Sequence, residues 1–182
     1  MTDTRQQLKQ IATEHIRRHT LHAASFREMG KALGIKSSSV HYHFDNREAL
    51  LLELVKDYEQ DFFRQLDEGC AALNSPAQRL QVLASLFLQS HSTRYQCLCL
   101  AFAAAGDEAS AAQHQAVQDF LQRLELWVTD TLTRAHLLPL AKPELARVIV
   151  SALEGALLLD RDQPQPMRLQ AVCLWLKTLT HL

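Results

Sequence analysis

The stretch from Ser25 to Arg47 constrains the fold of this chain most, because it places two short helices around a turn. Ser25 and Glu28 have the spacing of a capping box, in which a hydroxyl and a carboxylate satisfy amide groups at the start of a helix. Gly34 predicts the end of that helix, since glycine readily takes the left-handed conformation that follows a last turn. Gly30 lies where two crossing helices need close backbone approach. The stretch is therefore typical of a helix-turn-helix.

The second of these helices begins with short polar side chains. Lys36 and three consecutive serines lie between the apolar residues Ile35 and Val40. Small donors and acceptors at the front of a helix suit entry into the major groove, where base edges and phosphates are exposed. The pattern therefore indicates a DNA-contacting helix.

Residues 34–50, GIKSSSVHYHFDNREAL, resemble the amino-terminal signature of the TetR family of transcriptional regulators. In that family a turn glycine, an aromatic-rich stretch ending in Phe and a basic residue three positions later occur together, as Gly34, Phe44 and Arg47 do here. Ser38 and His41 depart from the common form, in which Gly and Tyr are frequent. The resemblance extends back through the capped helix at Ser25; beyond Leu50 it is one of layout.

The resemblance and the position of each side chain together define the candidate DNA contacts. We expect the three serines to contact base edges or phosphates, and the aromatic stretch and its basic neighbours to contact phosphates. Two further candidates lie at the start of the preceding helix. The set is Lys36, Ser37, Ser38, Ser39, His41, Tyr42, His43 and Arg47, with Ser25 and Arg27 as the further candidates. The alternatives are a solvated helix start for the serines, a solvated charge for the basic residues and core packing for one histidine.

The charge distribution agrees with a DNA-contacting amino-terminal region. Residues 1–50 carry eight basic and five acidic residues, or +3, and the rest of the chain carries 11 basic and 15 acidic residues, or −4. A basic head on an acidic body is typical of a nucleic-acid reader with a separate sensing domain. The amino terminus is polar and the longest apolar run, residues 97–105, is too short to span a membrane, so we expect a cytoplasmic protein without a membrane partner.

Helical periodicity runs through the whole chain, and strand patterns are not seen. The expected helices outside the helix-turn-helix cover residues 3–19, 45–73, 75–91, 95–105, 110–138, 142–160 and 167–182. We therefore predict an all-α protein of about nine helices. A three-helix helix-turn-helix DNA-binding domain is expected at residues 1–47, followed by an effector-binding and dimerisation domain at residues 48–182.

The last two expected helices are apolar over more than one face, which favours a partner surface. The resembling family dimerises through its two carboxy-terminal helices as a four-helix bundle. The candidate interface residues are Val148, Ile149, Ala152, Gly155, Ala156, Leu159, Leu169, Val172, Cys173 and Leu176. A two-fold homodimer suits a palindromic operator, because its two heads can enter major grooves about 34 to 36 Å apart.

In the resembling family a small-molecule effector binds among the middle helices of the body. The candidate lining residues are Phe62, Phe87, His91, Tyr95, Cys97, Cys99, Phe102, His114 and Trp127, and most of them are expected to be ordinary core. Cys97 and Cys99 also raise the hypothesis of thiol sensing. Two positions on a helix differ by about 200°, so these thiols point to opposite sides and do not form a local disulfide or a joint metal site.

These observations predict a ligand-relieved homodimeric repressor of transcription. The alternatives are a thiol-based redox- or electrophile-sensing repressor and a non-specific architectural DNA binder. An enzyme is disfavoured, because the sequence lacks a recognisable spacing of nucleophile, base and orienting residue and lacks a phosphate-binding glycine loop. No metal site or cofactor is expected: His15 and His19 share a helix face, but nothing nearby completes a ligand set.

Overall fold

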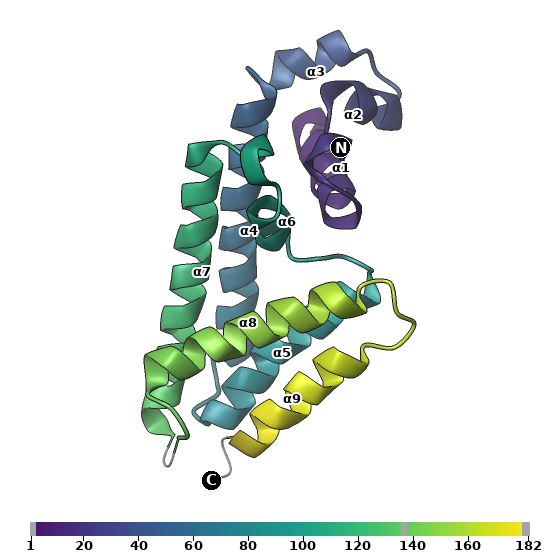
Figure 1. The fold of residues 1–182 in the computed structure, drawn as a ribbon. Helices are drawn as coiled ribbons and strands as arrows, with labels where there is room; N and C mark the ends of the chain where they lie inside the picture. Colours follow the sequence, from purple (N-terminus) through teal and green to yellow (C-terminus); the bar gives the residue numbers. More distant parts are fainter. Residues whose placement is uncertain (1–2, 136–137, 180–182) are drawn as a thin grey trace. The chain divides into compact units, whose positions relative to one another are not determined.

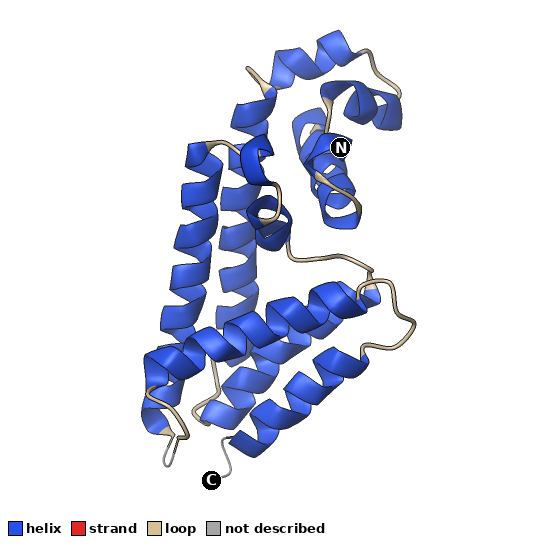
Figure 2. Cartoon of the chain, viewed as in Figure 1, coloured by secondary structure: helices blue, strands red, loops and turns tan. Residues whose placement is uncertain are grey.

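The computed structural model describes residues 3–135 and 138–179, apart from the side chain of Arg134. Within these residues every regular element is a helix and none is a strand (Figure 1 and Figure 2). The all-α prediction is therefore confirmed.

The described residues form nine α-helices joined by short turns. Their bounds are α1 (Thr4–Arg18), α2 (Phe26–Leu33), α3 (Ser37–His43), α4 (Arg47–Cys70), α5 (Pro76–Ser92), α6 (Leu98–Ala103), α7 (Ala111–Thr131), α8 (Lys142–Asp160) and α9 (Met167–Leu179). Three 3-10 turns are η1 (Leu21–Ala23), η2 (Gly106–Glu108) and η3 (Leu132–Arg134). The expected continuation of the last helix to Leu182 lies outside the described residues.

The chain divides into two compact units. The first consists of Met1–Gln60 and Leu98–Gln118, and the second of Asp61–Cys97 and Asp119–Leu182. The first unit thus contains α1 to α3, α6 and the amino-terminal parts of α4 and α7. The second contains α5, α8, α9 and the remainders of α4 and α7, and within it α5, α8 and α9 pack against one another.

Local signals place the helix-turn-helix where the sequence predicts it. The Oγ of Ser25 accepts a hydrogen bond from the amide of Glu28 at 3.2 Å, which caps α2. Gly34 ends the helix with φ 71°. A Cβ at Gly30 would lie 2.9 Å from the carbonyl oxygen of Ile35, so the turn into α3 requires glycine there.

The sequence also predicts a capping box of Asp45 and Glu48 at the start of one helix, and a helix that begins at Pro76 with Ser75 as its capping hydroxyl. Both predicted caps differ from the structure. Helix α4 begins at Arg47, and Asn46 rather than Asp45 caps it, because the Oδ1 of Asn46 accepts from the amide of Ala49 at 2.8 Å. Helix α5 begins at Pro76 as predicted, but Ser75 makes no side-chain cap hydrogen bond.

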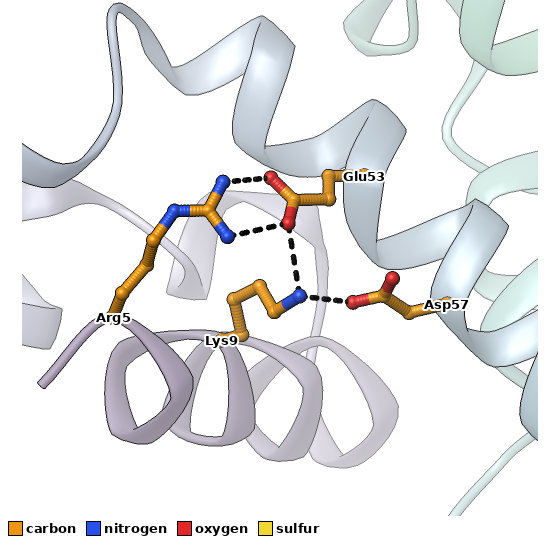
Figure 3. Close-up of polar contacts among 4 residues, drawn as sticks. All are labelled: Arg5, Lys9, Glu53 and Asp57. Carbon is orange, nitrogen blue, oxygen red and sulfur yellow. Dashed lines mark hydrogen bonds and ion pairs between the residues drawn. The ribbon is translucent and has the colours of Figure 1, made fainter. Parts of the chain in front are cut away.

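An ionic cluster joins α1 to α4 within the first unit (Figure 3). Arg5 and Lys9 of α1 face Glu53 and Asp57 of α4: Arg5 Nη1 and Lys9 Nζ lie 2.7 Å and 2.9 Å from Glu53 Oε1, and Lys9 also pairs with Asp57. The Arg5 hydrogen bond lowers the pKa of Glu53. Arg5 also lies over the ring of Phe44, 4.8 Å from its centroid. The amino-terminal half of α4 is thereby joined to α1, which also contacts Phe44 at the end of α3.

Candidate DNA-binding site

Helix α3 is anchored by one face and exposed on the other. Val40 and Phe44 are buried, whereas Ser37, Ser38 and Ser39 at the start of the helix are exposed. Lys36 at the N-cap position is exposed too. The serine cluster is therefore available to a nucleic acid, as a reading helix requires.

The aromatic stretch of α3 presents one large side chain to solvent. Tyr42 is 89% exposed, and the ring of His43 lies edge-on to it at a centroid distance of 5.4 Å. His41 packs edge-on against the buried ring of Phe26 at 4.7 Å. Apart from this ring contact His41 is exposed, and His43 is half-buried beside Tyr42, so neither histidine is a buried core residue. Tyr42 can reach a phosphate with its hydroxyl.

The candidates at the start of α2 are Ser25 and Arg27. The Oγ of Ser25 is the acceptor of the helix cap, so its hydroxyl hydrogen is the group it can offer to a phosphate. Arg27 is exposed in the first turn of α2. Both positions are consistent with contacts that orient the head on DNA.

Arg47 has a structural contact that the sequence did not indicate. Its Nε donates to the carbonyl oxygen of Ala24 at 3.2 Å, and its Nη2 donates to the carbonyl oxygen of Leu21. Its burial lowers the pKa of the guanidinium. Arg47 therefore holds the turn that precedes α2, and its contact with a phosphate stays a prediction.

The effector candidates are distributed over both units. Cys99, Phe102 and His114 belong to the first, and Phe62, Phe87, His91, Tyr95, Cys97 and Trp127 belong to the second. Phe62 packs edge-on against Phe87 and Phe120, at centroid distances of 6.3 Å and 5.4 Å. These aromatic contacts are those of a packed core. A ligand role for any member of the set stays a prediction.

Three other effector candidates have polar or cationic partners in the fold. His91 Nε2 lies 3.0 Å from the carbonyl oxygen of Asp160, and His114 Nε2 lies 3.0 Å from that of Gly106. The guanidinium of Arg79 lies over the ring of Trp127 at 5.0 Å. Each contact stabilises the fold irrespective of a ligand.

None of the four cysteines, all of which the structure describes, forms a disulfide. Cys70, Cys97 and Cys99 are buried and Cys173 is half-buried. Burial raises the pKa of the Cys70 and Cys173 thiols. Burial in apolar surroundings opposes formation of the reactive thiolate.

The carboxy-terminal helices expose an apolar surface, but four of the predicted interface residues are not part of it. Ile149, Ala156, Leu169 and Leu176 are buried within the unit, because α8 and α9 pack on each other and on α5, so their assignment to an interface is corrected. Val148 and Leu159 are exposed. The predicted residues Ala152, Gly155, Val172 and Cys173 are partly exposed.

Three further large apolar side chains are exposed on these two helices. They are Leu158 on α8 and Met167 and Leu174 on α9. Sequence periodicity does not identify them, because both helices are apolar over more than one face and the pattern does not tell which face packs internally. Together with Val148 and Leu159 they form what we call the α8–α9 apolar surface.

In the part of the chain that the structure describes, no helix is long and apolar enough to cross a membrane.

An all-helical fold that begins with a helix-turn-helix and exposes the polar start of α3 defines the class of helix-turn-helix transcriptional regulators. The chain belongs to the TetR family: the family model for bacterial regulatory proteins of the tetR family matches residues 11–54, and the model for the carboxy-terminal domain of LmrA/YxaF-like transcriptional regulators matches residues 76–173. The family resemblance of the sequence is confirmed. Members of this family are DNA-binding regulators rather than enzymes.

Solved structures share the fold over nearly the whole chain. A TetR transcriptional regulator from Legionella pneumophila has a TM-score of 0.90 at 22% identity, covering 98% of this chain and 97% of its own. A TetR-family regulator from Agrobacterium tumefaciens has a TM-score of 0.90 at 20% identity, covering 97% of both chains. The reduced form of NemR from Escherichia coli has a TM-score of 0.81 at 15% identity, covering 98% of both chains. No curated protein shows significant sequence similarity to this chain.

Proposed function

We propose that this protein is a sequence-specific repressor that binds a palindromic operator as a homodimer and releases it when a small-molecule effector binds. The observation that carries the proposal is the exposed front of α3, where Ser37, Ser38 and Ser39 precede the exposed Tyr42 in a TetR-family helix-turn-helix. Small hydroxyl groups suit base edges, and the tyrosine suits a phosphate. A repressor of bacterial genes acts in the cytoplasm.

The α8–α9 apolar surface supports a homodimer. TetR-family regulators usually dimerise, and five large exposed apolar side chains on two adjacent helices are more than scattered surface residues require. A two-fold axis through such a surface makes the same patch of each subunit complementary to itself. A palindromic operator matches that symmetry.

The proposed switch has two states. The empty dimer holds both α3 helices at groove spacing, and an effector that binds the helical body favours a dimer in which α4 is tilted and the heads no longer match the operator. The effector must bind the second state more tightly, since a ligand shifts an equilibrium only by its differential affinity. Helix α4 contributes residues to both compact units, as such coupling requires.

The test is selection of binding sites by the full-length protein from a random DNA library. The expected product is a sequence with dyad symmetry that is bound far more tightly than random DNA, with an affinity that falls steeply as salt is added. Equal affinity for selected and random DNA would instead identify a non-specific architectural binder. Effector candidates are then screened as compounds that release the selected operator.

A further inference from the structure

The start of α7 contains a capping box whose glutamine also contacts another helix. The amide of Ser110 donates to Gln113 Oε1 at 3.1 Å, and the amide of Gln113 donates to Ser110 Oγ at 3.4 Å. The bond from the Ser110 backbone amide to Oε1 fixes the orientation of the glutamine amide, and it does not depend on the Ser110 hydroxyl. The Nε2 of Gln113 is thereby directed away from its own backbone.

The Nε2 of Gln113 donates to the carbonyl oxygen of Glu48 in the first turn of α4, at 3.2 Å. Gln113 is only 1% exposed. A buried amide that loses its hydrogen-bond partner is left unsatisfied and destabilises the folded protein. This bond therefore contributes more to stability than a hydrogen bond between exposed groups does. The start of α7 is thus tied to the start of α4.

The turn that precedes α7 contacts the other end of the helix-turn-helix. In η2, Glu108 Oε1 lies 2.9 Å from His22 Nε2 in η1, a contact that becomes an ion pair when His22 is protonated. The negative charge of Glu108 also favours the charged form of Arg47, against the effect of burial on the pKa of that guanidinium. Arg47 in turn donates to the carbonyl oxygens of Leu21 and Ala24.

These contacts lie at both ends of the segment that contains α2 and α3, which we call the α2–α3 segment. Helices α2 and α3 lie in the chain between Ala24 and Arg47, and the Arg47 hydrogen bond joins the two ends of that segment directly. Gln113 holds one end at Glu48, and Glu108 holds the other at His22. All of these residues belong to the first compact unit.

We propose that Gln113 and Glu108 are positioning residues for DNA reading, which fix both ends of the α2–α3 segment so that α3 is held in one orientation. The expected effect on operator binding rests on the proposed function. The fixed orientation of the α2–α3 segment, in contrast, is a property of the free protein. If either contact is lost, a smaller fraction of heads has the orientation that the operator needs. The apparent dissociation constant for the operator then rises in inverse proportion to that fraction.

The following variants distinguish the proposed positioning role from an effect of helix capping and from an effect of a changed net charge. Gln113→Met removes the amide, and Gln113→Glu keeps an acceptor for Ser110 but loses the donor to Glu48. Ser110→Ala is the matched control, because it weakens the cap and leaves the Gln113 amide in place. Glu108→Gln tests the second contact in an exposed turn, and Asp107→Asn at the neighbouring position makes the same change in charge.

Two measurements are made on each full-length variant: amide hydrogen exchange of residues 21–47, and affinity for operator and for random DNA. We expect faster exchange over residues 21–47 and about fivefold weaker operator binding for Gln113→Met, Gln113→Glu and Glu108→Gln, with less than about twofold change on random DNA. The two controls should resemble the wild type in both measurements.

Exchange over residues 21–47 that matches the controls, or an equal loss of affinity for operator and random DNA, would overturn the inference. If the wild-type protein selects no operator, the proposed function fails, and the exchange data still decide whether these residues hold the segment. Glu108→Gln keeps the test decisive if a substitution at the buried Gln113 prevents folding.

Discussion

The Nε of Arg47 donates a hydrogen bond to the carbonyl oxygen of Ala24, 3.2 Å away, and so joins the first turn of α4 to the residue that precedes the α2 cap. The family resemblance implies a phosphate contact for Arg47. The two roles differ in what a substitution does to the free protein, because only the hydrogen bonds to Leu21 and Ala24 exist without DNA.

Arg47→Ala and Arg47→Lys should both destabilise the free protein. Two carbonyl oxygens lose a charged donor, and lysine does not reproduce the two-point contact of a guanidinium, so we expect a loss of about 2 kcal/mol for alanine and about 1 kcal/mol for lysine. That corresponds to a fall in melting temperature of about 4 to 8 °C and about 2 to 4 °C. Thermal unfolding followed by circular dichroism measures it. Unchanged melting with weakened operator binding would show a phosphate contact alone.

Tyr42→Ala should weaken operator binding by about tenfold and change stability by less than about 0.5 kcal/mol, because the side chain is almost fully exposed. Tyr42→Phe distinguishes the hydroxyl from the ring. A gel-shift titration gives the affinity, and Gln78→Ala at an exposed position of α5 is the control. Operator affinity that is untouched by both tyrosine variants would show that α3 is not the reading helix.

Leu159→Glu and Leu174→Glu should convert the proposed homodimer to a monomer, since each places a charge in the α8–α9 apolar surface. Leu126→Glu on α7 is the matched control, because Leu126 is 61% exposed and Leu159 is 63% exposed. Analytical ultracentrifugation at micromolar concentration reports the mass. A wild-type monomer would contradict the proposed homodimer, and dissociation by the control alone would place the interface elsewhere.

Asp160 should make the protein sensitive to acid. Desolvation alone would raise the pKa of this buried carboxyl, but the hydrogen bonds from the Leu169 amide and from the amide and side chain of Arg168 outweigh it and lower the pKa. A lowered pKa in the folded protein stabilises it above the ordinary range of the carboxyl, and that stabilisation is lost as the pH falls through the folded value.

Asp160→Asn should therefore melt at a lower temperature than the wild type at neutral pH, and the difference should shrink below about pH 4. Melting temperatures of both proteins across this range test the expectation. A difference that does not depend on pH would mean that the carboxylate charge contributes nothing and that only its acceptor geometry matters.

The ionic cluster of α1 and α4 should give part of the stability a dependence on salt. Lys9→Met should cost about 1 to 2 kcal/mol, because Lys9 is nearly buried between the carboxylates of Glu53 and Asp57. Adding Asp57→Asn should restore part of the loss, and the double variant should respond less to added salt than the wild type. Additive losses in chemical denaturation would contradict coupling of the pair.

Residues close together in the sequence are enough to specify the local structure of the helix-turn-helix. The Ser25 cap, the left-handed Gly34 and the crowded Gly30 each depend on residues within a few positions along the chain, so spacing was enough to place them. The α4 cap was misplaced by one residue because Asp45 and Asn46 are both good cap residues and sequence does not choose between them.

Tertiary structure alone decided which side chains on these helices face inward and which distant groups they meet. Arg47 binds carbonyl groups 23 and 26 positions away, and Gln113 reaches a carbonyl 65 positions away. Helices α8 and α9 are apolar on several faces, so burial of Leu169 and exposure of Leu174 follow only from how α5, α8 and α9 pack. Sequence periodicity shows how apolar residues are distributed around the axis of a single helix. Which of those residues are buried depends on the other helices that pack against it.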